Sequence, residues 1–185
     1  MNLHIKAVIF IGVSILILWV SRASLRSVHS HGFYRFFAWE AILLIILINL
    51  DNWFENPFSP FQIISWISLI ISLILVIPGF RLLHKAGKPN RTRSDPALVG
   101  IERTTELVTE GVYGAIRHPL YSSLIFLAWG AFFKKPSWLG LLLVAIAVFS
   151  LTLTAKIEEN ENIAYFGLAY EAYMKETKMF IPFIF

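Results

Sequence analysis

The chain has 185 residues, of which 57% are hydrophobic and only 15% are charged, and its mean hydropathy is +0.67. Soluble domains are about 45–50% apolar and about 25% charged, so the composition excludes an ordinary soluble protein and a disordered one. The absence of cysteine excludes disulfides, thiolate zinc sites and a cysteine nucleophile. We interpret the net charge of +4 as charge that faces anionic lipid, and not as a nucleic-acid surface.

Five apolar segments have the composition of membrane-spanning helices, which need about 20 apolar residues. In chain order they are residues 3–20, 33–50, 61–80, 119–133 and 137–155. The first could be a signal peptide, but no small-residue cleavage site precedes an evident mature domain, so we expect a retained helix. Glu40, inside the second, should face protein, with Arg35 as a candidate partner. The fourth is short, so it should tilt little, or Lys134 and Lys135 should extend to the membrane interface.

Lysine and arginine are distributed unequally between the two sides that these spans define. Thirteen of the sixteen lie around the loop after the first span, in residues 81–118 and in the tail from residue 156. The other three are Lys6, Lys134 and Lys135. Because basic residues accumulate on the cytoplasmic side of membrane proteins, this asymmetry predicts that the long loop and the tail are cytoplasmic and that the N-terminus is outside.

The densest polar cluster, residues 110–121, precedes and opens the fourth span. Pro119 suits the first position of a helix, which makes His118 the residue that caps it. The free N–H groups of a helix start favour an anion, and Arg117 adds a guanidinium suited to a carboxylate. Tyr121 lies one turn into the helix. The alternative is that Arg117 and His118 only anchor a helix end at the lipid headgroups.

A second polar cluster, residues 156–162, follows the fifth span. Its acidic side chains stand at a helix C-terminus, which disfavours negative charge, so a cation should compensate. The spacing of Glu158, Glu159 and Asn162 lets one helical face present both acid and amide groups. The alternatives are a solvated acidic turn, or salt bridges to Arg117 or Arg103.

The fourth and fifth spans form a short hairpin, which brings the two clusters to the same end of adjacent helices. The combined site would bind an anion through one cluster and a cation through the other. A zwitterionic, cationic ligand such as S-adenosylmethionine would match both. The aromatic residues of the tail, from Tyr165 to Phe185, form either an interfacial belt or a wall over an apolar pocket. No histidine spacing indicates a metal site, and the dinucleotide and phosphate-loop motifs are absent.

Four ordered segments resemble the isoprenylcysteine carboxyl methyltransferase family of integral-membrane enzymes, which has a related phospholipid methyltransferase branch. They are Leu107–Tyr113, Arg117–Tyr121, the pair Glu158-Glu159, and Phe166-Gly167 with Tyr170 and Tyr173. The resemblance implies one domain over 1–185, with N-terminal spans and a loop to residue 104 and a catalytic core at 105–185. It implies about five membrane helices and a pocket for S-adenosylmethionine on the cytoplasmic side.

The family motifs also imply roles for individual residues. The residues expected to contact the cofactor are Leu107, Val108, Gly111, Tyr113, His118, Pro119, Tyr121, Glu158 and Glu159. Independently of the motifs, we predict that Arg117 and Glu159 are the candidate catalytic residues, with Arg117 or Arg103 orienting an acidic substrate. The family often has a histidine two residues before the Leu-Val pair, whereas this chain has Thr105.

The expected reaction is methylation of a lipophilic or prenylated substrate, with carboxyl O-methylation favoured. A carboxylate acceptor needs no general base, since the sulfonium of the donor already carries the leaving group. An amine or a thiol would need a proton acceptor, which a glutamate could supply, so phospholipid N-methylation and thiol S-methylation remain alternatives. Two other classes also remain, an NADPH-dependent membrane reductase and a non-catalytic membrane scaffold. The sequence does not predict an oligomeric state.

Overall fold

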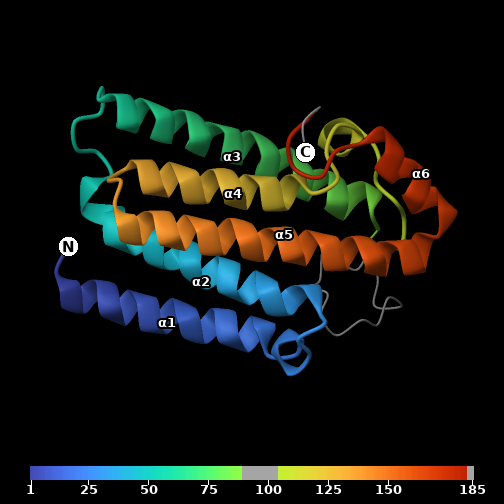
Figure 1. The fold of residues 1–185 in the computed structure, drawn as a ribbon, viewed down its shortest axis with the longest axis horizontal. Helices are drawn as coiled ribbons and strands as arrows, with labels where there is room; N and C mark the ends of the chain where they lie inside the picture. Colours follow the sequence, from blue (N-terminus) through green and yellow to red (C-terminus); the bar gives the residue numbers. More distant parts are fainter. Residues whose placement is uncertain (89–103, 183–185) are drawn as a thin grey trace.

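The structure, a computed structural model, describes residues 1–88 and 104–182. These residues form the helices α1 (Leu3–Ser21), α2 (His31–Asn49), α3 (Pro60–Ala86), α4 (Pro119–Phe133), α5 (Trp138–Phe166) and α6 (Leu168–Glu176). Short 3-10 turns occur at Ser24–Arg26 (η1), Leu50–Asn52 (η2) and Gly111–Gly114 (η4). In Figure 1, α1 to α5 run side by side as long rods, and α6 lies at one end of the bundle. The predicted all-helical architecture is confirmed.

Each predicted span corresponds to one of these rods. Four are long and apolar enough to cross a membrane, namely α1, α2 with its η2 extension, α3 and α5. The remaining rod, α4, has 15 residues and is shorter, as the sequence indicates. By length and composition, these helices are suited to span a membrane.

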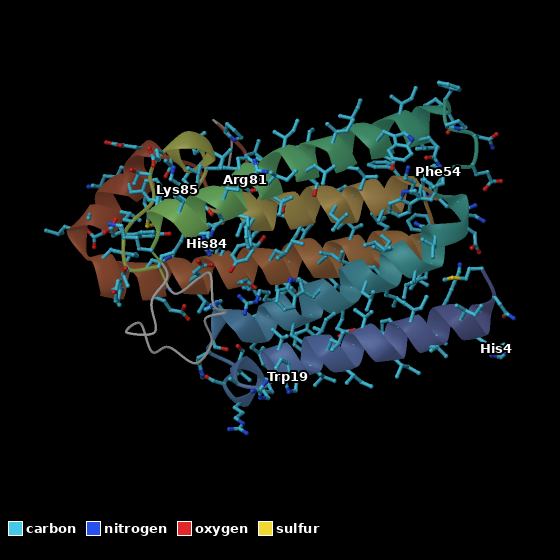
Figure 2. The ribbon with its side chains drawn as sticks, turned by 180° about the vertical axis from the view of Figure 1, so that it is seen from behind. His4, Trp19, Phe54, Arg81, His84 and Lys85 are labelled. Atoms are coloured by element: carbon cyan, nitrogen blue, oxygen red, sulfur yellow. The ribbon has the colours of Figure 1, made fainter. Side chains whose placement is uncertain are left out.

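The helices α3 and α5 continue well beyond the apolar segments that define their spans. Their 27 and 29 residues correspond to about 40 Å or more, against about 30 Å of hydrocarbon. Each continues through its polar residues until a glycine, Gly87 or Gly167, follows its last turn. Figure 2 shows Arg81, His84 and Lys85 on the α3 extension, at the opposite end of the bundle from His4 and Phe54. The expected loop therefore begins at Gly87.

Small residues let the helices approach one another closely. Ala38 and Ala41 of α2 are buried together with Ala147 and Ala155 of α5, and these two helices pack extensively. Between α3 and α4, the hydroxyl of Ser65 donates to the carbonyl of Gly130 at 2.7 Å. Small residues and interhelical hydroxyl bonds are typical of helix packing in membranes. This packing fixes where α4 and α5 present their polar ends.

The acidic residue inside α2 faces protein, as predicted, but its hydrogen-bond partner lies on α1. Glu40 accepts a hydrogen bond of 2.6 Å from the hydroxyl of Ser14. Arg35 is itself buried, with its guanidinium 5.0 Å from the ring centroid of Trp39. The Ser14–Glu40 bond and the 2.9 Å pair of Lys6 with Asp51 join α1, which is largely exposed, to the rest of the bundle.

Lys134 does not extend to the membrane interface as an exposed side chain. It is 4% exposed, its ammonium lies 3.4 Å from the ring centroid of Trp66, and it donates to Gln62 at 3.0 Å. The sequence shows only a short hairpin here. An aromatic ring and an amide from α3, distant in sequence, stabilise the ammonium inside the protein.

Candidate functional site

The first polar cluster is held at the start of α4 by the C-terminal segment of the chain. Pro119 begins α4 and His118 is its N-cap residue, as predicted. The amide of Arg117 donates to the carbonyl of Lys178 at 2.8 Å, and that of His118 donates to the carbonyl of Met179 at 3.2 Å. The amide of Lys178 donates back to Ala115. This short pairing of the tail with residues 115–118 fixes the backbone that carries both basic side chains.

Arg117 joins this cluster to α5 through an ion pair with Glu159. The Nε of Arg117 lies 2.6 Å from Oε1 of Glu159, and both side chains are less than a tenth exposed. The guanidinium also donates to the backbone carbonyls of Met174 and Thr177, just before the tail pairing. The salt bridge considered from the sequence is therefore present, and it supplies the cation that the acidic end of α5 requires.

His118 lies between two carboxylates. Its Nδ1 is 3.8 Å from Oε2 of Glu158, and its Nε2 is 3.4 Å from Oε1 of Glu159. The imidazole is buried and stacks on the ring of Tyr121, with centroids 5.4 Å apart and planes 14° apart. The two clusters therefore meet at one end of the α4–α5 hairpin.

Two adjoining pockets open at this meeting point and share Leu83, Tyr113, Arg117, His118 and Glu158 in their walls. The larger has a cavity volume of about 50 Å³ within about 460 Å³ of empty space that includes open solvent. Its other lining residues are Thr104, Glu106, Leu107, Val108, Asn162, Phe166, Tyr170 and Tyr173. Pro119, Leu120 and Tyr121 complete the second pocket. Among the residues described, Oε2 of Glu158 is buried and makes no hydrogen bond.

The tyrosines of α6 form a wall of the larger pocket. Burial raises the pKa of Tyr173 and of Tyr170, and the negative charge of Glu158 raises that of Tyr170 further. Both phenols therefore remain protonated at neutral pH. The hydroxyl of Tyr173 donates to the backbone carbonyl of Tyr113 at 2.6 Å, which ties α6 to η4.

The predicted site residues mostly gather here, but two lie outside both pocket walls. Gly111 begins η4 with φ +59, a backbone conformation that favours glycine, and a Cβ there would also displace the terminal methyl of Leu82, which would lie 2.7 Å away. Glu159 contacts Arg117 and His118, which line both pockets, but does not line either pocket itself. Thr105, the departure from the family pattern, donates to the carbonyl of Lys88 and does not line the pockets. Arg103 lies outside the described residues.

Sequence reasoning missed Leu83, Thr104 and Glu106 as pocket residues. Leu83 follows the end of the apolar span at Phe80, where the sequence predicts a loop, whereas α3 continues to Ala86 and carries this residue into both pockets. Residues 81–86 contain no proline or glycine, so the sequence could have predicted that the helix continues to Gly87 and includes Leu83.

Residues 61–167 match the phospholipid methyltransferase family, and the chain belongs to this family. The matched region thus places the chain in a family of membrane methyltransferases, and the resemblance drawn from the sequence motifs is confirmed. A protein-S-isoprenylcysteine O-methyltransferase of Schizosaccharomyces pombe is 33% identical over 81 residues, which cover 42% of this chain and 34% of that protein. The chain thus spans about a third of that relative's length. No solved structure matches this chain.

Proposed function

We propose that this protein transfers a methyl group from S-adenosylmethionine to a lipophilic acceptor in the paired pockets at the end of the α4–α5 hairpin. The observation that carries the proposal is the convergence of Arg117 and His118 with Glu158 and Glu159 beside these pockets. The family match and the curated relative support methyl transfer as the reaction.

The residues present fit a zwitterionic sulfonium. The buried Oε2 of Glu158 makes no hydrogen bond among the residues described, so it offers an acceptor for a cationic group. Asn162, one turn further along α5, adds an amide to the same wall. Leu107, Val108, Tyr170 and Tyr173 offer apolar and aromatic surface. When bound, the donor would supply an electrophilic methyl group with its leaving group already in place.

The task left to the chain is to orient the reactants and exclude water, which can contribute about 7–11 kcal/mol. Glu159 would hold Arg117 and His118 in place, since it contacts both. The smaller pocket adds Pro119, Leu120 and Tyr121 beside the polar groups, which suits the reacting end of a lipid. Because both pockets include Leu83, we propose that the catalytic unit includes α3 in addition to residues 105–185.

Carboxyl O-methylation follows the named activity of the relative, and Arg117 would then orient the acceptor carboxylate. One observation favours N-methylation as a second candidate. The guanidinium of Arg117 is already bound by Glu159 and two backbone carbonyls, whereas Oε2 of Glu158 makes no hydrogen bond among the described residues. In this alternative Glu158 would take a proton from an amine acceptor and would not hold the cationic group of the donor. The chemical form of the methylated product distinguishes a prenylated acceptor from a phospholipid or another lipophilic acceptor.

Calorimetry on the purified protein tests donor binding. We expect S-adenosylhomocysteine to bind and NADPH not to bind. Glu158→Gln should weaken S-adenosylhomocysteine binding by about tenfold, the loss of one charge-assisted contact. Glu171→Gln is the matched control, because Glu171 is exposed on α6 and does not line the pockets. Binding of NADPH alone would support a reductase, and binding of neither ligand would support a scaffold.

The acceptor is tested by incubating membranes with methyl-labelled S-adenosylmethionine and extracting the lipids. A labelled ester releases methanol in alkali, so volatile label would identify carboxyl O-methylation. Alkali-stable label that stays with the phospholipid headgroup would identify N-methylation. Absence of any labelled lipophilic product, with the donor bound, would contradict the proposed lipophilic acceptor.

A further inference from the structure

A second ion pair holds the polar end of α5, on a different side from Arg117. His31, the first residue of α2, is fully buried, and its Nδ1 lies 2.6 Å from Oε2 of Glu161 on α5. The two residues are 130 positions apart in the chain. Neither lines the pockets of the candidate site.

Helix geometry relates the two ion pairs to the pocket. Successive residues of an α-helix are rotated by about 100°, so Glu159 and Glu161 point about 160° apart around α5. Glu158 and Asn162 point into the sector between them, about 40° from each other. These two residues are the ones that α5 places in the pocket wall before its last turn. The two ion pairs therefore flank the face that lines the pocket.

The end of α5 needs such contacts because its apolar packing stops earlier. The last buried apolar residue of α5 is Ala155, and beyond it Glu159 is the only residue of this helix that is buried. Ala164 is exposed, and α5 continues to Phe166. In Figure 1 this end of α5 extends past the start of α2. Over its last two to three turns, where Ile157, Ile163 and Phe166 are only half-buried, polar contacts therefore contribute to setting the rotation of the helix.

We propose that His31 is a positioning residue for the donor pocket: by pairing with Glu161, it fixes the rotation of the α5 end and so directs Glu158 and Asn162 into the pocket. This inference rests on the proposed function only for the identity of the ligand. The rotation of the α5 end depends on the contact between α2 and α5 and not on any ligand. Arg117 and His118 hold the same helix from the α4 side through Glu159.

The first test measures S-adenosylhomocysteine affinity by calorimetry for His31→Ala, Glu161→Gln and the double variant. Each single variant should weaken binding by about tenfold, and the double variant should be no weaker than either, because the pair acts as a unit. His31→Asn should restore affinity to within about twofold, since the asparagine amide can replace the Nδ1 donor. His29→Ala is the matched control, because His29 is exposed.

Additive losses in the double variant, or full affinity in His31→Ala, would overturn the proposal. A loss that follows thermal stability alone, without rescue by His31→Asn, would also overturn it, since this is the behaviour of a merely structural residue.

The second test needs no ligand and therefore separates this inference from the proposed function. The chain has no cysteine, so spin labels at Lys85→Cys on α3 and Ala164→Cys on α5 report one distance without background labelling. His31→Ala should broaden or shift the distance distribution between the labels, and His31→Asn should not. An unchanged distribution in His31→Ala would overturn the proposal. If the unaltered protein binds no S-adenosylhomocysteine, the proposed function fails, and the spin-label result alone decides the role of His31.

Discussion

At the scale of single residues, the site is organised by charges that are removed from water. Arg117 and Glu159 are both nearly buried and lie 2.6 Å apart, with His118 beside the carboxylate. A buried pair of this kind contributes little net stability compared with a well-packed apolar pair, but removing one member leaves an uncompensated charge. The arrangement is therefore expected to serve geometry: it holds a guanidinium and an imidazole at fixed places beside the pockets.

Arg117→Ala should destabilise the protein by about 3–5 kcal/mol, because Glu159 would remain buried without its main partner. Arg117→Ala/Glu159→Leu should recover part of that loss, since the double variant no longer buries a lone carboxylate. Thermal unfolding in detergent measures both. Both variants should lose methyl transfer, because each lacks the group that positions the site. Equal stability of the single variant and the unaltered protein would show that the pair is solvated.

At the scale of the elements, the residues of the candidate site lie at helix ends, while the apolar residues that pack the bundle lie in helix interiors. Pro119 starts α4 beside Gly79 of α3, where a Cβ on the glycine would meet Leu120 at 3.2 Å. This close approach places the start of α4 against the α3 extension that supplies Leu83. At the opposite end, the α4–α5 connection is fixed by Lys134, whose ammonium contacts Trp66 and Gln62.

Lys134→Met should lower stability by about 2 kcal/mol, the value of a desolvated cation–π contact, because Trp66 and Gln62 lose their partner. Lys135→Met is the matched control, since Lys135 is the exposed neighbour in the same connection. Thermal unfolding in detergent should separate the two variants by several degrees. The affinity for S-adenosylhomocysteine should stay unchanged in both, because this cluster lies at the far end of α4 from the pockets. A shared effect on the two variants would contradict a specific role of Lys134.

At the scale of the whole molecule, the polar elements collect at one end of the bundle. The α3 extension with Arg81 and Lys85, the η4 turn and α6 lie at the same end, away from His4 and Phe54 (Figures 1 and 2). If the bundle spans a membrane, this end and the pockets lie on the same side of that membrane. The basic excess predicts that this side is the cytoplasm.

Single cysteines test this orientation in intact cells. Lys85→Cys, at the pocket end, should be protected from a membrane-impermeant maleimide until the cells are permeabilised. Lys135→Cys, in the α4–α5 connection, should be labelled without permeabilisation. Both positions are exposed on the protein, so accessibility reports the side of the membrane. The reverse pattern would place the pockets outside the cytoplasm and would contradict the predicted orientation.

The sequence by itself determined the five rods, the start of α4 at Pro119 and the meeting of the Arg117–His118 and Glu158–Glu159 clusters. These features depend on local hydrophobic runs, on the missing N–H of proline and on the requirement that a short hairpin returns to the same end. Only the tertiary structure decided that Lys134 is buried, that Leu83 enters both pockets and that His31 pairs with Glu161. Each of these contacts joins residues distant in the chain, and such pairings follow from how helices pack against one another, which no local pattern encodes.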